Sequence, residues 1–379
     1  MLKRHYKLLA VAALACLGST ANAQSLFRWV KPVECNNCAE TCDTGCNTGG
    51  GVYGSAGILF LKSYANGNLS YSTFATESVN GVPVSNITTV NEFDNGVDIG
   101  YRATIGYSGG DGWGGRIRYF KWESADNQTA VDNTDGIPVG GTGVVSRLDA
   151  AAPLGLQFFT SFGSVNDPTT TVYGNIMRVE IWDLELTKNT TCGCMDLTWS
   201  AGLRYLQLNQ QYNATEKLQN VPPTDDRNFE SRISQTLRSQ HTLNGLGPIL
   251  GLEGRHNIFD NLSVYGLGRV GFIFMEGRQE AYHRINHDPD TVPIFIDNPE
   301  LFSAQQDRAK MVTTAEVELG LEYGVSVGNS QVYARGGLLG MHFGGVGNSS
   351  RSARGAGPFE SQNDNLSLFG LTASIGIRY

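Results

Sequence analysis

The sequence predicts an all-β fold: a transmembrane antiparallel up-and-down β-barrel of about ten strands, with twelve as the alternative count. Two observations carry this prediction, namely long runs that alternate apolar and polar residues, and connections that alternate in length. A period of two is the pattern of a strand with two different faces. No apolar run beyond the N-terminus approaches the ~20 residues of a membrane helix.

The clearest alternation is in SLFGLTASIGIRY, at the C-terminus, where apolar side chains from Phe369 to Tyr379 share one face. The same pattern recurs in DIGYRATIGY, DLTWSAGLRY and KMVTTAEVELGLEYGV. Strands of soluble sandwiches typically have ~5–6 residues, whereas a tilted strand that crosses a bilayer needs ~9–11. The length of these runs therefore favours a barrel whose apolar face meets lipid.

The connections give an independent test of the barrel. Ten strand-like segments begin near residues 52, 97, 113, 174, 195, 244, 262, 311, 331 and 366. The long connections between them are 65–96, 125–170, 210–243, 278–309 and 344–364. The short ones are near 108–112, 188–194, 255–261 and 327–330. Long extracellular loops and short periplasmic turns are typical of outer-membrane barrels. The run LGLQFF, at 154–159, would start an extra hairpin in the twelve-strand alternative.

The N-terminus predicts export. A basic start, an apolar run from Leu8 to Leu17 and an A-x-A site ending at Ala23 form a signal peptide over residues 1–23. Residues 24–51 are then a Cys- and Gly-rich periplasmic segment, and 52–379 form the barrel in the bacterial outer membrane. Removing three cations changes the formal charge from −8 to −8 − 3 = −11, which argues against a nucleic-acid partner.

Charged residues on the polar faces are expected to line the barrel interior. They allow two interpretations: a polar channel that filters solutes by size and charge, or ion pairs that fill the lumen, as side chains nearly do in barrels of ~8 strands. These lumen-lining candidates are Arg102, Arg116, Arg118, Arg204, Glu253, Arg269, Glu316, Glu318, Glu322, Arg335 and Arg378. In 174–187 one face combines Arg178 and Glu180 with Trp182 and Leu184, and in 262–276 both faces are apolar.

Motifs that suggest other chemistry have simpler explanations. GLGRVG, at 266–271, matches a dinucleotide fingerprint but continues into the β-rich FIFMEG rather than a helix. His283 and His287 have metal-ligand spacing but lie in a predicted loop with prolines. No G-x-S-x-G motif accompanies any histidine. We therefore predict no enzyme, cofactor or metal site, with a barrel-embedded hydrolase as the least favoured alternative.

Four segments resemble the Legionella-type major outer membrane protein family: LTWSAGLRYLQLNQQY, GLGPILGLEGRHNIFDNLSVYGLGRVGFIF, VELGLEYGVSVGNSQVYARGGLLGMHF and SLFGLTASIGIRY. The resemblance covers roughly residues 171–379, and residues 24–90 carry little of it. It implies a pore-forming barrel and supplies no catalytic residues. Tyr379 resembles the C-terminal signal by which the barrel-insertion machinery recognises such strands.

Six cysteines remain after export: Cys35, Cys38, Cys42, Cys46, Cys192 and Cys194. Exported cysteines in even number usually form disulfides. The predicted topology puts all six at the periplasmic rim, so at least one disulfide is expected between the N-terminal segment and the 188–194 turn. Metal binding, or a link to another envelope protein, is the alternative.

The function expected from these features is passive passage of small solutes through a polar lumen lined by Arg and Glu. The alternative is a non-conducting barrel with a structural or adhesive role. The expected partners are outer-membrane lipid, the insertion machinery and the solutes themselves.

Overall fold

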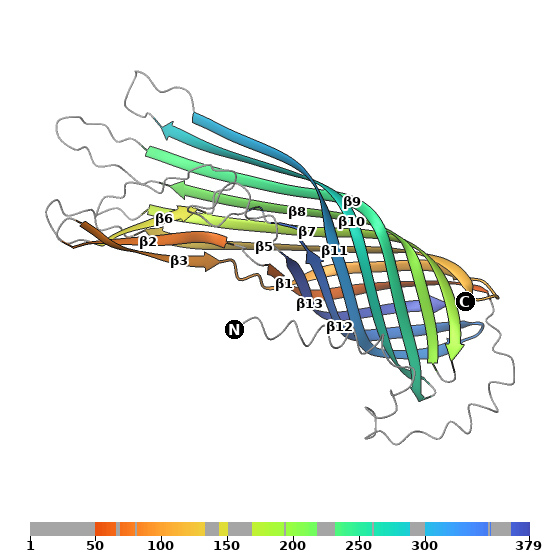
Figure 1. The fold of residues 1–379 in the computed structure, drawn as a ribbon. Helices are drawn as coiled ribbons and strands as arrows, with labels where there is room; N and C mark the ends of the chain where they lie inside the picture. Colours follow the sequence, from red (N-terminus) through yellow and green to blue (C-terminus); the bar gives the residue numbers. More distant parts are fainter. Residues whose placement is uncertain are drawn as a thin grey trace. The chain divides into compact units, whose positions relative to one another are not determined.

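The computed structural model describes residues 50–379 except 66–68, 80–81, 133–143, 151–168, 193–194, 218–231, 260, 289–299, 348 and 350–364. All described residues belong to one of two units of the chain, Thr48–Tyr379. Ten of its strands form a closed antiparallel barrel (Figure 1). They are β1 (Gly51–Ala65), β4 (Val97–Ser108), β5 (Trp113–Asp132), β7 (Thr169–Cys192), β8 (Met195–Lys217), β9 (Arg232–Phe259), β10 (Leu262–Asp288), β11 (Glu300–Val327), β12 (Ser330–Gly344) and β13 (Leu366–Arg378).

The barrel closes where the first strand meets the last. β1 pairs with β13 from Tyr53 opposite Arg378 to Ala65 opposite Leu366. The backbone N–H of Tyr379 also donates to the carbonyl of Val52 at 3.0 Å. Closure leaves no sheet edge, which lipid could not supply with hydrogen bonds. The predicted ten-stranded barrel is thereby confirmed.

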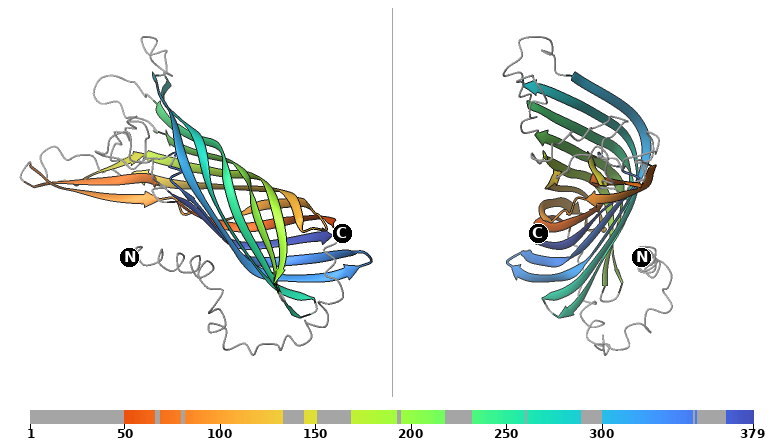
Figure 2. Two further views of the ribbon diagram at one scale, coloured as in Figure 1. Left: turned by 45° about the vertical axis from the view of Figure 1, so that its right-hand side comes forward. Right: turned by 90° about the vertical axis from the view of Figure 1, so that its left-hand side faces the viewer.

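Short turns join the strands at one end of the barrel. Gly109–Gly112 lead from β4 into β5, and Gly112 has a φ of 82° that favours glycine. Gly328 has a φ of 60° between β11 and β12. At the other end the strands continue as long, curved extensions (Figure 2). The predicted alternation of long and short connections is therefore present.

Two features of the fold differ from the sequence prediction. β7, β9 and β11 begin at Thr169, Arg232 and Glu300, about 5 to 12 residues earlier than predicted. A separate sheet, ordered β3-β2-β6, lies in connections that were expected to be loops. Its strands are β2 (Leu69–Val79), β3 (Val82–Glu92) and β6 (Val144–Ala150). The proposed extra hairpin at 154–159 lies outside the described residues.

The outer surface changes from apolar to polar between two neighbouring rows of side chains. Each row runs through directly paired residues of β5, β7, β8, β9, β10 and β11. The last apolar row is Tyr119, Trp182, Tyr205, Leu246, Phe274 and Met311. The next row is Lys121, Glu180, Gln207, Asn244, Glu276 and Ala309. Aromatic residues followed by charges mark the border between lipid and water, so we call the first row the border row.

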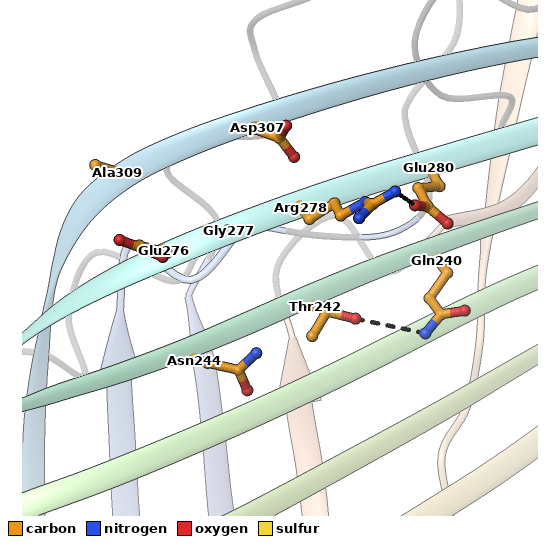
Figure 3. A pocket seen from close by; sticks show the side chains of 9 residues that line it. All are labelled: Gln240, Thr242, Asn244, Glu276, Gly277, Arg278, Glu280, Asp307 and Ala309. Atoms are coloured by element: carbon orange, nitrogen blue, oxygen red, sulfur yellow. Dashed lines mark hydrogen bonds and ion pairs between the residues drawn. The ribbon is translucent and has the colours of Figure 1, made fainter.

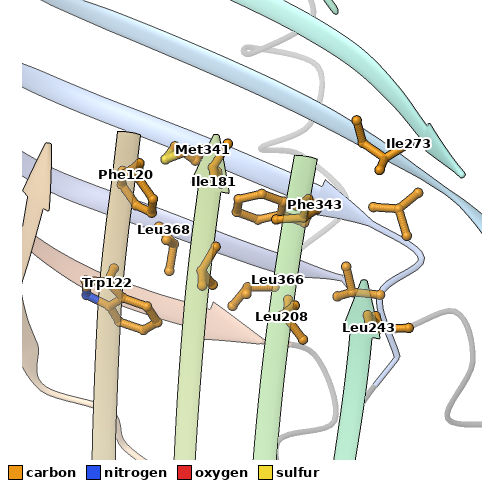
Figure 4. Packing of buried hydrophobic residues seen from close by; sticks show 14 of the residues in the cluster. Phe120, Trp122, Ile181, Leu208, Leu243, Ile273, Met341, Phe343, Leu366 and Leu368 are labelled. Atoms are coloured by element: carbon orange, nitrogen blue, oxygen red, sulfur yellow. The ribbon is translucent and has the colours of Figure 1, made fainter. Parts of the chain in front are cut away.

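The interior changes in the opposite sense at the same level. On β8, Arg204 faces inward below the border row, and Leu206 and Leu208 face inward above it. Twenty buried hydrophobic residues form one cluster, which we call the apolar layer (Figure 4). They come from nine of the ten barrel strands, all except β4, and from the segment after β12. Among its largest members are Trp122, Phe343, Met177 and Ile181. The described residues contain no helix long and apolar enough to cross a membrane.

Candidate functional site: the interior of the barrel

A network of ion pairs crosses the barrel directly below the apolar layer. Asp183 on β7 accepts from Arg204 on β8 at 2.7 Å. Glu316 on β11 accepts from Arg118 on β5 at 2.9 Å, from Arg204 at 3.1 Å and from Arg269 on β10 at 3.2 Å. β5 and β11 are not neighbours in the sheet, so these side chains meet inside the barrel.

Two further carboxylates extend the network toward the short turns. Glu185 pairs with Arg116, and it accepts from Arg269 at 3.0 Å. Glu253 accepts from Arg116 at 3.1 Å and from Arg335 at 2.9 Å. Each carboxylate thus serves two guanidinium groups. An arginine suits this arrangement because its planar fork presents five donors.

The end of the network nearest the short turns centres on one carboxylate. Glu322 accepts from Arg335 at 2.6 Å and from Arg378 at 2.9 Å, and it lies 3.2 Å from Arg255. Three cations share this acid. The guanidinium of Arg378 also lies 4.1 Å from the centre of the Tyr333 ring, close enough for a cation–π interaction.

A separate branch joins β4 to β11. Arg102 pairs with Glu318, whose residue number is 216 higher, and also donates to Thr372 at 3.0 Å. The hydroxyl of Tyr265 donates to Glu318 at 2.7 Å. The Thr372 hydroxyl donates to Glu318 at 3.4 Å, so this carboxylate is bound from β4, β10 and β13.

All eleven residues proposed from the sequence as lumen-lining belong to this network. It also contains three that the sequence analysis missed: Asp183, Glu185 and Arg255. Asp183 and Glu185 lie in the segment whose faces were uncertain, and Arg255 was assigned to a turn. With eight arginines and six carboxylates, the network has a formal charge of 8 − 6 = +2.

The network leaves little free space where it is deepest. The side chains of Arg269, Glu185 and Glu316 are at most 4% exposed, and a cavity of only about 10 Å³ lies beside Arg118 and Arg204. A larger cavity of about 270 Å³ lies nearer the short turns, between Arg102, Arg335 and Arg378 among others. The interior therefore holds a polar vestibule at one end and a filled cross-section above it.

A segment after β12 adds to the apolar layer. Val346 is fully buried within it. Gly345 and Gly347 have φ values of 77° and 74°, which allow the chain to turn inward. The ammonium of Lys310 donates to the carbonyl of Val346, and the Gln210 amide donates to that of Gly347 at 3.3 Å. Backbone carbonyls thus tie this segment to β11 and β8.

The other sequence motifs do not assemble a reactive site within the described residues. GLGRVG lies inside β10, with no helix after it. His283 and His287 lie in β10, so their assignment to a loop was wrong: the strand continues to Asp288. His283 is buried and contacts Gln235 at 3.1 Å, and His342 contacts Ser367 at 2.9 Å on the outer face. The part of the chain that the structure describes contains no group of three or more His, Cys, Asp or Glu suited to a metal.

A second concave region lies on the outer surface of β9, β10 and β11, above the border row (Figure 3). Its volume is about 620 Å³. Gln240, Asn244, Glu276, Arg278 and Asp307 point toward it from the three strands. Arg278 pairs with Glu280 at its rim. This polar face belongs to the extensions of the strands, outside the lipid-facing band.

Predictions on the N-terminus and the cysteines fall mostly outside the described residues. This holds for the signal peptide, the four cysteines up to Cys46, and Cys194. The backbone of Cys192 ends β7 and pairs with Met195, the first residue of β8. Tyr379 is exposed on the outer face after β13.

A closed antiparallel barrel with a lipid-facing band and a charged interior defines an integral outer-membrane protein. The family model described as "Legionella pneumophila major outer membrane protein precursor" matches residues 54–378. The chain belongs to this family. The match confirms the resemblance found in the sequence and extends it toward the N-terminus, well beyond residue 171.

Several solved barrels are distantly similar. The outer membrane protease OmpT of Escherichia coli has 10% identity, covers 87% of this chain and 96% of its own, and gives a TM-score of 0.34. A Pseudomonas aeruginosa FadL homologue has 8% identity, and the match covers 88% of this chain and 90% of the homologue with a TM-score of 0.23. OmpT of Vibrio cholerae has 12% identity, and the match covers 87% of this chain and 97% of that protein with a TM-score of 0.16. No curated protein matches the chain. These similarities are too distant to support statements about function.

Proposed function

We propose that this protein is a pore-forming outer-membrane protein whose lumen is closed at rest. The observation that supports the proposal is the ion-pair network in the membrane-embedded half of the barrel. Buried ion pairs are weak contributors to stability, and well-packed apolar residues often replace them without loss. The same strands carry such an apolar filling one level higher. A purely structural barrel has no need of charges here, whereas a solute pathway has.

The closed state follows from two barriers in series. The apolar layer excludes water at the level of Phe343, and the network fills the section around Glu316. Passage requires the apolar layer to open and the ion pairs to exchange partners. Five of the six carboxylates already pair with two or three arginines, so each of these keeps an arginine partner when another one leaves. Small ions and solutes are the cargo we expect, because ten strands enclose a lumen much narrower than that of a barrel with ~16 strands.

Conductance of the purified protein in planar bilayers tests the proposal. We expect rare, brief openings for the wild-type chain. Phe343→Ala removes a fully buried ring from the apolar layer and is expected to increase open probability severalfold. The matched control Phe272→Ala removes a lipid-facing ring that is 52% exposed, and its conductance should equal that of wild type. Silence of all three proteins at every voltage would refute the pore.

The second candidate is a non-conducting barrel with a structural role, and the apolar layer favours it. The layer contains Trp122 and Phe343, both fully buried, together with the inward segment at Val346. A permanently sealed barrel predicts that Phe343→Ala lowers stability without opening a channel. The same recordings therefore separate the two candidates. We propose no enzymatic activity for either.

A further inference from the structure

The lipid-facing surface near the short turns contains a groove of about 680 Å³. Gly115 on β5 and Ala201 on β8 lie at its floor, on either side of Leu186 on β7. Ile105 and Tyr107 on β4 form one wall. The groove is apolar and faces outward, so it is separate from the charged interior.

The groove exists because small residues occupy its floor, and the backbone there leaves room for larger side chains. A Cβ atom placed on Gly115 would meet its nearest neighbour, the carbonyl oxygen of Glu185, at 3.7 Å, an ordinary contact. The outward residues two positions away on the same strand are large, Trp113 and Ile117. A larger residue would therefore fit at Gly115, whose missing side chain leaves the space open between Trp113 and Ile117.

A basic group stands at the end of the groove nearest the periplasm. Trp113, Lys188 and Trp199 are paired side by side on β5, β7 and β8, two positions from the groove floor. The ammonium of Lys188 lies 5.0 Å from the centre of the Trp113 ring and donates to the carbonyl of Asp111 at 2.7 Å. Aromatic and basic side chains at this level meet lipid headgroups.

We propose that this groove binds one phospholipid of the periplasmic leaflet. Its phosphate interacts with the ammonium of Lys188 between the two indole rings. One acyl chain follows β5 past Gly115 and fills the groove between Tyr107 and Leu186. The apolar floor and the single cation at its mouth match the two ends of such a molecule. The site does not depend on whether the barrel conducts.

Phospholipid retention after a delipidating detergent wash tests the site, with bound lipid counted by native mass spectrometry. The protein is first folded in vesicles of phosphatidylethanolamine and phosphatidylglycerol. Wild type should retain one phospholipid per barrel. Gly115→Leu fills the groove and should abolish retention. Lys188→Gln should lower occupancy about fivefold, the effect of one basic residue at an anionic lipid surface.

Two matched controls should retain lipid as wild type does. Gly268→Leu alters an outward position on β10 with no atom within 4 Å of its Cβ. Lys121→Gln removes a lysine at the opposite border. Folding of each variant is checked by its heat-dependent shift on a detergent gel, and Lys188→Gln changes only a surface side chain. Equal retention by all variants would overturn the site in favour of non-specific lipid. Dimers of wild type that Gly115→Leu abolishes would assign the groove to a second copy instead.

Discussion

The lower and upper halves of the same strands have opposite designs. Below the border row, lipid meets Leu203 of β8 while Arg204 faces the interior. Above it, Gln207 faces outward while Leu206 faces the interior. The lower half is apolar outside and charged inside, and the upper half is built like a water-soluble protein. The comparison teaches that the surrounding solvent, rather than the strand, decides which face is apolar.

The same contrast holds for ion pairs. Glu316, in the lower half, binds three arginines and its side chain is 4% exposed. Glu123, above the border row, pairs with Arg178 on the outer face, and their side chains are 41% and 45% exposed. Water screens the second pair and not the first.

Glu316→Ala should destabilise the barrel most. It leaves three buried arginines short of a carboxylate, and breaking a buried pair by removing one partner costs about 3–5 kcal/mol. The measurement is the free energy of unfolding in urea from lipid vesicles. A loss under about 1 kcal/mol would mean that water reaches the network and that the lower half is not dry.

Leu208→Ala should cost about 2–5 kcal/mol because it leaves a cavity in the apolar layer. Leu203→Ala, on the same strand but facing lipid, is the control. Lipid chains fill the space left at that position, so we expect less than half the loss. Equal losses would show that the upper interior is not a packed core. Both values come from the same urea titrations.

Leu203→Arg should cost about 1–3 kcal/mol, because a lipid-facing arginine costs about 2–4 kcal/mol at the bilayer midplane and about 0–1 kcal/mol near the interfaces, and Leu203 lies between the two. Gln207→Arg, two outward positions further along β8, should cost about 0–1 kcal/mol. The pair brackets the border row on one strand. A large cost at Gln207 would show that lipid contacts β8 above the border row. A small cost at Leu203 would show that water reaches the strand below it.

Glu123→Ala should have the smallest effect, about 0–1 kcal/mol, because its pair with Arg178 is exposed to water. Raising the salt concentration should remove what effect there is. A double-mutant cycle with Arg178→Ala measures the coupling directly. A coupling as large as that at Glu316 would erase the distinction between the two halves.

Much of the barrel could be predicted from the sequence because apolar and polar residues alternate regularly wherever the outer face of a strand meets a single solvent. Where the solvent changes along a strand, the rule fails. Arg178, Glu180, Trp182 and Leu184 all face outward, the first two above the border and the last two in lipid. No single apolar face exists there, so Asp183 and Glu185 were missed between them.

A local signal for this change is present in the sequence. Two adjacent apolar residues interrupt the alternation on three strands, at Tyr119–Phe120, Ile181–Trp182 and Tyr205–Leu206. Each pair contains one member of the border row. Each such pair marks the point where the apolar side chains change from the outer to the inner face of the strand. These pairs therefore indicate the level of the border row and the start of the apolar layer. The uncertain faces of 262–276 have the same cause, since Ile273 and Met275 face the interior beside outward Phe272 and Phe274.

The partners within the network could not be predicted. Arg102 and Glu318 are 216 residues apart and lie on strands that are not neighbours. Which charges meet across a barrel depends on the stagger and tilt of every strand between them. Alternation identifies the inward residues but carries no information about that stagger. Nor does it reveal the sheet formed by β2, β3 and β6, which depends on pairing between distant segments.

The border row also has a mechanical consequence for the bilayer. On β5 the outward apolar stretch runs from Trp113 to Tyr119, six residue steps or about 20 Å along the strand. On β10 it runs from Val264 to Phe274, ten steps or about 33 Å. A membrane of uniform thickness cannot match both sides. We therefore expect the barrel to lean, or the leaflets to thin beside β5, so that short-chained lipids collect on that side through hydrophobic mismatch.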